Sequence, residues 1–314
     1  PMNCPHHTQI YASSPKSYKD LPVRYTEATT NYRDEQAGEL LGLSRVRSIT
    51  QDDGHVFCTE DQIEQEVSII VQVVREFYDC LGMLKENLYW VSLSVRDPNT
   101  PENYLGDSKI WDNSEKILEN IAKKENLEYK RVEGEAAFYG PKLDFMFKDA
   151  IGREWQLATI QLDFNMPDRF ELEYIDSSNE KKTPVMIHRA IAGSLERFMS
   201  VMIEHYAGAF PLWLSPVQVK VLPIGEGHRE YAHEVEAKLR ENDIRVEIDE
   251  SDETLGKRIR NGKTEKVPYI LVIGDKEVEA KTVSVESRDK GDSGAKTLDE
   301  LIENLKEEIE GRSQ

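Results

Sequence analysis

The sequence predicts a mixed α/β protein with two domains, a larger one built on antiparallel strands and a smaller one in which strands and helices alternate. The chain has 314 residues, a length that suits about two domains. Residues 22–58 contain two strand-like runs joined by a loop with two glycines, which indicates a long antiparallel hairpin. After a proline-bounded linker at residues 210–216, strand and helix patterns alternate, as in a compact α/β domain.

The composition is that of a globular protein, with 39% hydrophobic and 32% charged residues and a net charge of −19. Such an acidic chain argues against nucleic-acid binding over the whole surface, although a local basic groove is compatible with it. Three cysteines do not form a disulfide framework, so we expect a reducing compartment and a cytoplasmic location. No apolar run approaches the roughly 18 residues of a membrane span, and we expect no membrane partner.

The chain begins with a thiol beside two imidazoles, at Cys4, His6 and His7. Pro5 predicts an extended conformation for Cys4, because the residue before a proline avoids the helical region. The group is either a buried cysteine near a surface histidine pair or part of a functional site. A short helix is predicted at residues 13–21. Because the structured pattern starts at the first residue, we interpret the chain as a fragment of a longer protein.

The stretch from residue 45 to residue 58 has no helical period and is predicted to be a strand. Side chains alternate between the faces of a strand, so one face carries Arg45, Arg47, Gln51, Asp53 and His55. Unpaired charge is costly to bury, so this row faces either a ligand or water. The variety of donors and acceptors favours a ligand over a solvated face with incidental charges.

The other helices and strands of the larger domain are predicted from the spacing of hydrophobic residues along the sequence. Residues 59–62 are similar to a capping box, and the one-sided apolar stripe behind them predicts a helix that ends at Gly82. A second amphipathic helix is predicted at 109–125, with strands at 88–95 and 184–189 and a mainly β pattern over 129–174. The strand within residues 155–164 carries uncharged polar residues, which require either a ligand or an internal network.

Arg197 lies at the margin of the buried stripe of a helix that carries residues 193–198. It either pairs with Glu196 or Glu204 or holds a phosphate. In the smaller domain, strands are predicted at 217–224, 244–249, 269–273 and 281–287, and helices at 229–242, 255–262 and 298–310.

Six motifs, taken in chain order, resemble those of the threonyl-tRNA synthetase family. They lie at residues 2–5, 33–35, 45–53, 138–142, 161–164 and 188–197. The resemblance implies the antiparallel-sheet catalytic core of a class II synthetase in residues 1–212. It implies a small α/β anticodon-binding domain in residues 213–314. The family's amino-terminal domains, editing domain and first class II motif would lie upstream of this chain.

The implied activity is that of an aminoacyl-tRNA ligase, which joins threonine and ATP to form threonyl-adenylate and then transfers threonine to tRNA(Thr). The partners would be ATP, L-threonine and tRNA(Thr), and the full-length protein would be a homodimer. Two alternatives stay open: a related class II synthetase for another amino acid, and a synthetase-like tRNA- or ligand-binding protein without turnover.

The resemblance also implies a zinc ion held by Cys4, His55 and His188, residue types that suit this cation. Zinc would select threonine over valine, which has nearly the same shape but no hydroxyl. His6 and His7 are competing ligand candidates. Magnesium would accompany ATP.

By motif, the ATP-binding residues would be Arg33, Glu35, Arg45 and Arg197, with the arginines on the phosphates and Glu35 at the adenine end. The amino-acid site would contain Gln51, Asp53, Tyr139, Lys142, Thr159 and Gln161.

The anticodon-binding domain departs from the family pattern at two positions where arginine is common, Ser251 and Glu286. A glutamate facing RNA phosphates would repel them. The candidates for RNA contact in this domain are Lys257, Arg258, Arg260, Lys276, Glu277, Lys281 and Arg288.

Overall fold

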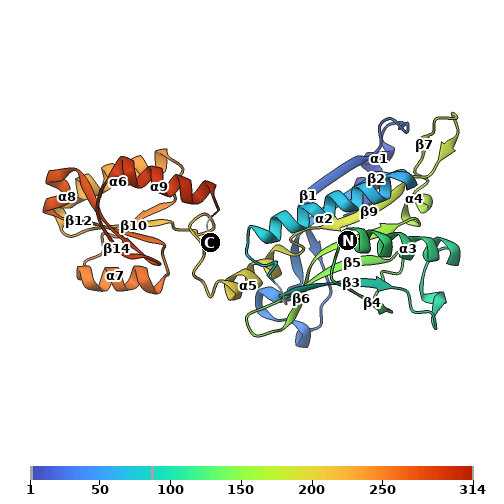
Figure 1. The fold of residues 1–314 in the computed structure, drawn as a ribbon, viewed down its shortest axis with the longest axis horizontal. Helices are drawn as coiled ribbons and strands as arrows, with labels where there is room; N and C mark the ends of the chain where they lie inside the picture. The colour runs from blue at the N-terminus through green and yellow to red at the C-terminus, as the bar shows by residue number, and fades with distance from the viewer. Residues whose placement is uncertain (1–2, 86–87, 313–314) are drawn as a thin grey trace. The chain divides into compact units, whose positions relative to one another are not determined.

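The computed structural model describes residues 3–85 and 88–312 and divides into two compact units, residues 1–202 and 203–314 (Figure 1). Each unit has its own sheet. The motif residue Met2 lies outside the described residues. No helix in the described part of the chain is both long and apolar enough to span a bilayer.

A seven-stranded sheet forms the centre of the first unit. Its strands, in spatial order, are β1 (Val23–Tyr32), β2 (Ser48–Cys58), β9 (Val185–Ala190), β6 (Glu154–Asp163), β5 (Lys142–Lys148), β3 (Tyr89–Val95) and β4 (Tyr129–Glu133). Neighbouring strands are antiparallel except β3 and β4, which are parallel. The predicted antiparallel core and the β1–β2 hairpin are therefore confirmed. Two short strands, β7 (Tyr174–Ile175) and β8 (Lys181–Lys182), form a separate ribbon.

Two amphipathic helices, α2 (Ile63–Asp79) and α3 (Ser108–Lys124), lie side by side over one face of this sheet (Figure 1). The apolar stripe of α2 is buried, as its period predicts, and Tyr78 at its end stacks on Phe147 of β5. Because side chains alternate along each strand, the opposite face can carry polar residues. The remaining helical segments of the unit are η1 (Ala37–Glu39), η2 (Gly42–Ser44), η3 (Glu60–Gln62), η4 (Pro101–Asn103), α4 (Met166–Arg169) and α5 (Leu195–His205).

The first helix, α1 (Cys4–Ala12), corrects two expectations about the N-terminal segment. Cys4 is the first helical residue rather than extended, because Pro5 falls in the first turn, where a helix needs no N–H. Tyr11 packs against Phe57 in a small core beneath the helix. The helix expected at residues 13–21 is wrong, because the backbone of residues 16–18 instead bonds to Ile175 at the edge of β7.

The second unit contains a five-stranded sheet in the order β11 (Val246–Ile248), β10 (Val219–Pro223), β12 (Tyr269–Ile273), β13 (Thr282–Ser287) and β14 (Gly291–Thr297). β10 is parallel to both β11 and β12, and the later pairs are antiparallel. The helices of the second unit are η5 (Glu226–His228), α6 (Arg229–Glu241), α7 (Leu255–Thr264), α8 (Asp275–Ala280) and α9 (Leu298–Glu310). The strand and helix predictions hold to within two residues, but α8 and β14 were not expected, since β14 is an exposed edge strand without an apolar pattern.

Gly140 tests how tightly the loop after β4 is seated on the sheet. A methyl group at its Cα would lie 1.7 Å from the backbone carbonyl oxygen of Leu162 on β6, so the two backbones must separate. We expect Gly140→Ala to lower the free energy of unfolding by about 1–3 kcal/mol. Gly38→Ala, where the added methyl meets open space, should change it by less than about 0.5 kcal/mol. Urea unfolding followed by circular dichroism measures both, and equal midpoints for Gly140→Ala and the parent chain would refute the close approach.

Candidate functional site

The register of the large sheet places the predicted polar residues in rows on its open face. His55 of β2 pairs with His188 of β9, which pairs with Gln161 of β6, which pairs with Lys142 of β5. Directly paired residues point to the same face of a sheet. Four strands that are far apart in sequence therefore contribute one continuous row of side chains.

A second row lies two residues after Lys142 on β5, where Asp144 pairs with Thr159 of β6. Asp144 is buried and accepts hydrogen bonds from Ser94, Gln156 and Thr159 at 2.6–3.0 Å. The ammonium nitrogen of Lys142 lies 2.8 Å from Oδ2 of Asp144. The polar residues of β6 thus take part in an internal network, one of the two explanations that the sequence left open.

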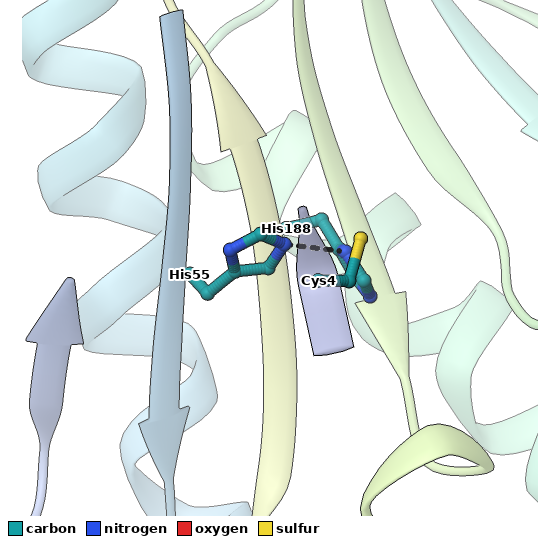
Figure 2. A group of neighbouring side chains, drawn as sticks. All are labelled: Cys4, His55 and His188. Carbon is teal, nitrogen blue, oxygen red and sulfur yellow. Dashed lines mark hydrogen bonds between the residues drawn. The ribbon is translucent and has the colours of Figure 1, made fainter. Parts of the chain in front are cut away.

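Cys4, His55 and His188 converge as a buried group in which one ligand atom from each lies within 4.8 Å of the others (Figure 2). Nε2 of His55 lies 3.0 Å from Nδ1 of His188. The residues come from α1, β2 and β9, so no sequence spacing connects them. Figure 2 shows the Cys4 side chain beside the two imidazole rings.

The chemistry of this group fits a zinc ion. A thiolate and two imidazoles are zinc ligands, and two nitrogens at a tetrahedral zinc are about 3.3 Å apart, close to the separation in this group. Burial lowers the pKa of His55 to about 2, so its ring is neutral and able to ligate. Burial opposes charge on His188, but its bonds to Asp163 and Cys4 outweigh burial and raise its pKa to about 9. The site therefore stabilises positive charge at this point.

The two competing histidines lie differently. His6 is exposed, and its Nδ1 is 2.7 Å from the side-chain oxygen of Asn3. His7 is buried, but it contacts Nδ1 of His55, the nitrogen that faces away from His188. Neither belongs to the ligand group formed by the described residues.

Four arginines line the same cavity, and three of them are the predicted Arg33, Arg45 and Arg197. The guanidinium group of the fourth, Arg189, pairs with Asp52 at 2.9 Å. Burial, and then the nearby Arg33 and Arg45, lower the pKa of Arg197, which is the signature of cations crowded together. Arg197 donates to the backbone carbonyls of Ser44 and Gln156. Within the described residues it forms no ion pair, neither with Glu196 nor with Glu204. A polyanion such as a phosphate chain would relieve this repulsion.

Arg45 lies before β2, because the strand begins at Ser48 and not at Arg45 as predicted. Its guanidinium pairs with Glu35 at 2.8 Å, and this hydrogen bond lowers the pKa of the Glu35 carboxyl. Arg47 is exposed and lies outside the cavity, and its Nε donates to the backbone carbonyl of Glu35. The predicted polar row along this segment is thus reduced to Gln51, Asp53 and His55.

Eleven of the thirteen predicted catalytic-domain residues line one cavity. The other two, His55 and Lys142, are paired in the sheet with the cavity residues His188 and Gln161. Burial raises the pKa of the Asp53 carboxyl. Burial also raises the pKa of the Tyr139 hydroxyl, which donates to Gln161. The Tyr139 ring lies 5.0 Å from the ring of His188, which joins the amino-acid candidates to the metal-ligand group.

Gln156 and Asp163 are among the residues of this region that were not predicted. Gln156 points to the open face because a β-bulge opposite Phe145 and Met146 shifts the alternation along β6, and no local sequence signal reveals that bulge. Asp163 accepts from His188 at 3.0 Å. Strand alternation from Gln161 would have placed it on the same face, so the sequence did contain that signal.

The two units match two family models. Residues 1–206 match the tRNA synthetase class II core domain (G, H, P, S and T), and residues 218–308 match the anticodon binding domain. The threonyl-tRNA synthetase structure from Cryptosporidium parvum Iowa II, titled as its RNA binding domain, superposes with a TM-score of 0.91. It is 38% identical, and the match covers 98% of this chain and 76% of that one.

The chain belongs to the threonyl-tRNA synthetase family.

Sequence relatives agree with this assignment. The threonine–tRNA ligases of Phocaeicola vulgatus and Caldanaerobacter subterraneus subsp. tengcongensis are 49% and 50% identical over 309 residues, which is 98% of this chain. The match covers 47% of each, so the chain spans about half the length of the curated relatives it matches. A putative threonyl-tRNA synthetase from Aeropyrum pernix superposes with a TM-score of 0.81 at 29% identity, covering all of this chain and 75% of that one.

In this member of the threonyl-tRNA synthetase family, two of the anticodon-domain candidates serve the fold. Arg258 is 4% exposed, and its guanidinium donates to the carbonyls of Pro223 and Asp249. Arg288 donates to the carbonyls of Phe210 and Lys266 and pairs with the neighbouring Asp289. Guanidinium groups bound in this way are poorly placed to reach RNA phosphates.

The other candidates lie nearer the surface. Lys257, Arg260 and Lys276 are exposed, although Lys257 pairs with Glu253. Glu277 accepts from the backbone N–H of Gly274 and so caps α8. Lys281 follows α8 and pairs with Glu234. Of the two positions that depart from the family pattern, Ser251 bonds to Asp249 and Glu286 pairs with Lys263.

The ligand group predicts the metal content of the purified chain. We expect about one zinc ion per chain, and Cys4→Ser should lower that content because it removes the only sulfur of the group. Cys58→Ala is a matched control, since Cys58 lies on the same strand as His55 but points to the opposite face. Elemental analysis after dialysis measures all three proteins. A full complement of zinc in Cys4→Ser would exclude this group as the binding site.

Proposed function

We propose that this chain carries the catalytic core and the tRNA-binding end of a threonine–tRNA ligase, which activates threonine with ATP and transfers it to tRNA(Thr). One observation carries the proposal: the buried Cys4, His55 and His188 group adjoins a cavity that is also lined by the three arginines predicted to bind phosphate, Arg33, Arg45 and Arg197. A soft-ligand cation site beside a polyphosphate site is what threonine activation requires.

ATP would bind with its phosphates on the arginines. Activation is an in-line displacement at the α-phosphate, and it depends on positioning and on stabilising charge in the transition state. Arg33 is suited to the α-phosphate, and Arg45 and Arg197 to the outer phosphates, with magnesium alongside. Glu35 would meet the adenine end, because its salt bridge with Arg45 keeps the carboxylate ionised as an acceptor.

Threonine would bind between the metal-ligand group and the open face of β5 and β6. A zinc ion held there by Cys4, His55 and His188 would attract the amino group and the hydroxyl of threonine, and valine has no hydroxyl to offer. Asp53 and Tyr139 lie beside this group and would meet the polar atoms of the amino acid. Gln51, Lys142, Thr159 and Gln161 would complete the pocket.

The rest of the proposal concerns the whole protein. Chemistry would lie in residues 1–212, and residues 213–314 would bring tRNA(Thr) to it. The homodimer follows from the family alone. A cytoplasmic location is supported by Cys4 and Cys58, which form no disulfide.

Arginine substitutions test the ATP site. Arg33→Ala or Arg197→Ala should cost about 2–4 kcal/mol of transition-state stabilisation, because each removes charged donors from the transferring group. Arg169→Ala removes an exposed arginine outside the cavity and should leave the rate unchanged. Threonine-dependent exchange of pyrophosphate into ATP measures all three.

The same assay separates the alternatives. Exchange stimulated by another amino acid and not by threonine would indicate a different class II specificity. Absence of exchange with every amino acid, while ATP still binds, would favour a binding protein without turnover. Full exchange by Arg33→Ala or Arg197→Ala would show that the role given to that residue is wrong.

Glu286 tests the tRNA surface of the second unit. If β13 faces RNA, Glu286→Arg should tighten tRNA(Thr) binding, because one phosphate contact is added. The slope of log K against log salt concentration should then become steeper by about 0.7–0.9. Glu286→Gln removes the carboxylate without adding a donor, so it should tighten binding less and leave the slope unchanged. Affinities at several salt concentrations measure both effects, and an unchanged Glu286→Arg would place the RNA elsewhere.

A further inference from the structure

One buried histidine beside the metal-ligand group has no role in the function proposed above. His7 lies on α1, one turn after Cys4, and is 3% exposed. Its Nδ1 lies 2.7 Å from Nδ1 of His55, and its Nε2 lies 3.1 Å from a carboxylate oxygen of Glu27 on β1. Both ring nitrogens of a buried side chain are therefore in contact with polar partners.

The direction of these hydrogen bonds follows from the ligand role of His55. A histidine binds a metal through a nitrogen without hydrogen, so a ligating Nε2 leaves the hydrogen of His55 on Nδ1. That Nδ1–H can only donate to Nδ1 of His7, which puts the hydrogen of His7 on Nε2. The second N–H then donates to Glu27. One tautomer of each ring satisfies both contacts.

The second ligand histidine reaches a carboxylate directly. Nε2 of His188 lies 3.0 Å from Asp163, which fixes the ring that presents Nδ1 to the ligand group. Among the residues that the structure describes, no carboxylate lies at hydrogen-bond distance from His55, since the nearest oxygen of Asp53 is 3.9 Å from its Nδ1. His7 fills this gap and extends the contact to Glu27.

We propose that His7 and Glu27 are positioning residues that hold His55 in the tautomer and orientation needed to bind the metal. Glu27 also accepts a hydrogen bond from Asn3, the residue before Cys4. One carboxylate thus restrains the segments that present two of the three ligands. The inference rests on the proposed zinc site and assigns to it a hydrogen-bonded chain that ends at a partly exposed carboxylate of β1.

A packing role for His7 makes a different prediction. Its ring lies 4.9 Å from that of His55 and 5.4 Å from that of Tyr25, so its removal would also leave a gap. Glutamine distinguishes the two roles, because its amide can accept from His55 and donate to Glu27, as the histidine does. Glutamine is also a poor replacement for a direct zinc ligand.

The test measures zinc affinity by competition with a chelator, and the absorption of bound cobalt(II) as a probe of thiolate and imidazole coordination. His7→Ala should weaken zinc binding about 10- to 100-fold, the usual effect of removing an outer partner of a metal ligand. His7→Gln should recover most of that loss and keep the cobalt spectrum of the parent chain. His6→Ala, on the exposed neighbouring residue, should leave the affinity unchanged.

Glu27→Ala keeps the inference testable if His7→Ala does not fold, because Glu27 is exposed and lies outside the core. It should weaken zinc binding by about tenfold. Unchanged affinity in a folded His7→Ala or in Glu27→Ala would overturn the inference, as would His7→Gln binding as weakly as His7→Ala. A parent chain that binds no zinc would overturn the metal site itself, and the two failures are therefore distinguishable.

Discussion

Backbone pairing between β2, β9, β6 and β5 is the constraint on which the first unit depends. It sets His55, His188, Gln161 and Lys142 in one cross-strand row through backbone hydrogen bonds. The helices α2 and α3 cover the other face, and their apolar contacts keep the sheet in this register. Function therefore lies on the face that packing leaves free.

Charge is distributed unevenly in this acidic chain. The net charge is −19, yet the cavity is lined by four arginines and by a histidine, His188, whose pKa is raised. Carboxylates are present too, but most are engaged: Glu35 with Arg45, Asp144 with Lys142, and Asp163 with His188. The cavity is thus lined by more arginines than carboxylates, although acidic residues dominate the whole chain.

Much of this arrangement was predictable from the sequence, because strand alternation and helical period are local signals. The hairpin, the long helices and the polar face of β2 follow from them. The metal-ligand group does not, since Cys4, His55 and His188 meet only through the tertiary fold and were found through the family resemblance. Gln156 depends on a bulge, and the helical start at Cys4 depends on where Pro5 falls in the first turn. Arg258 looked available for RNA because exposure cannot be deduced from a basic residue type alone.

The cross-strand row has a consequence for how such a protein can change over time. A side-chain period of two means that inserting or deleting one residue in β9 would turn His188 away together with every later side chain of the strand. A change of length within β2, β5, β6 or β9 is therefore disfavoured unless a bulge absorbs it, as in β6, whereas the turn at residues 149–153 and the ribbon of β7 and β8 contribute nothing to the row. Among descendants of this sequence, gaps should collect in those two segments, and the four strands should differ mainly by substitution.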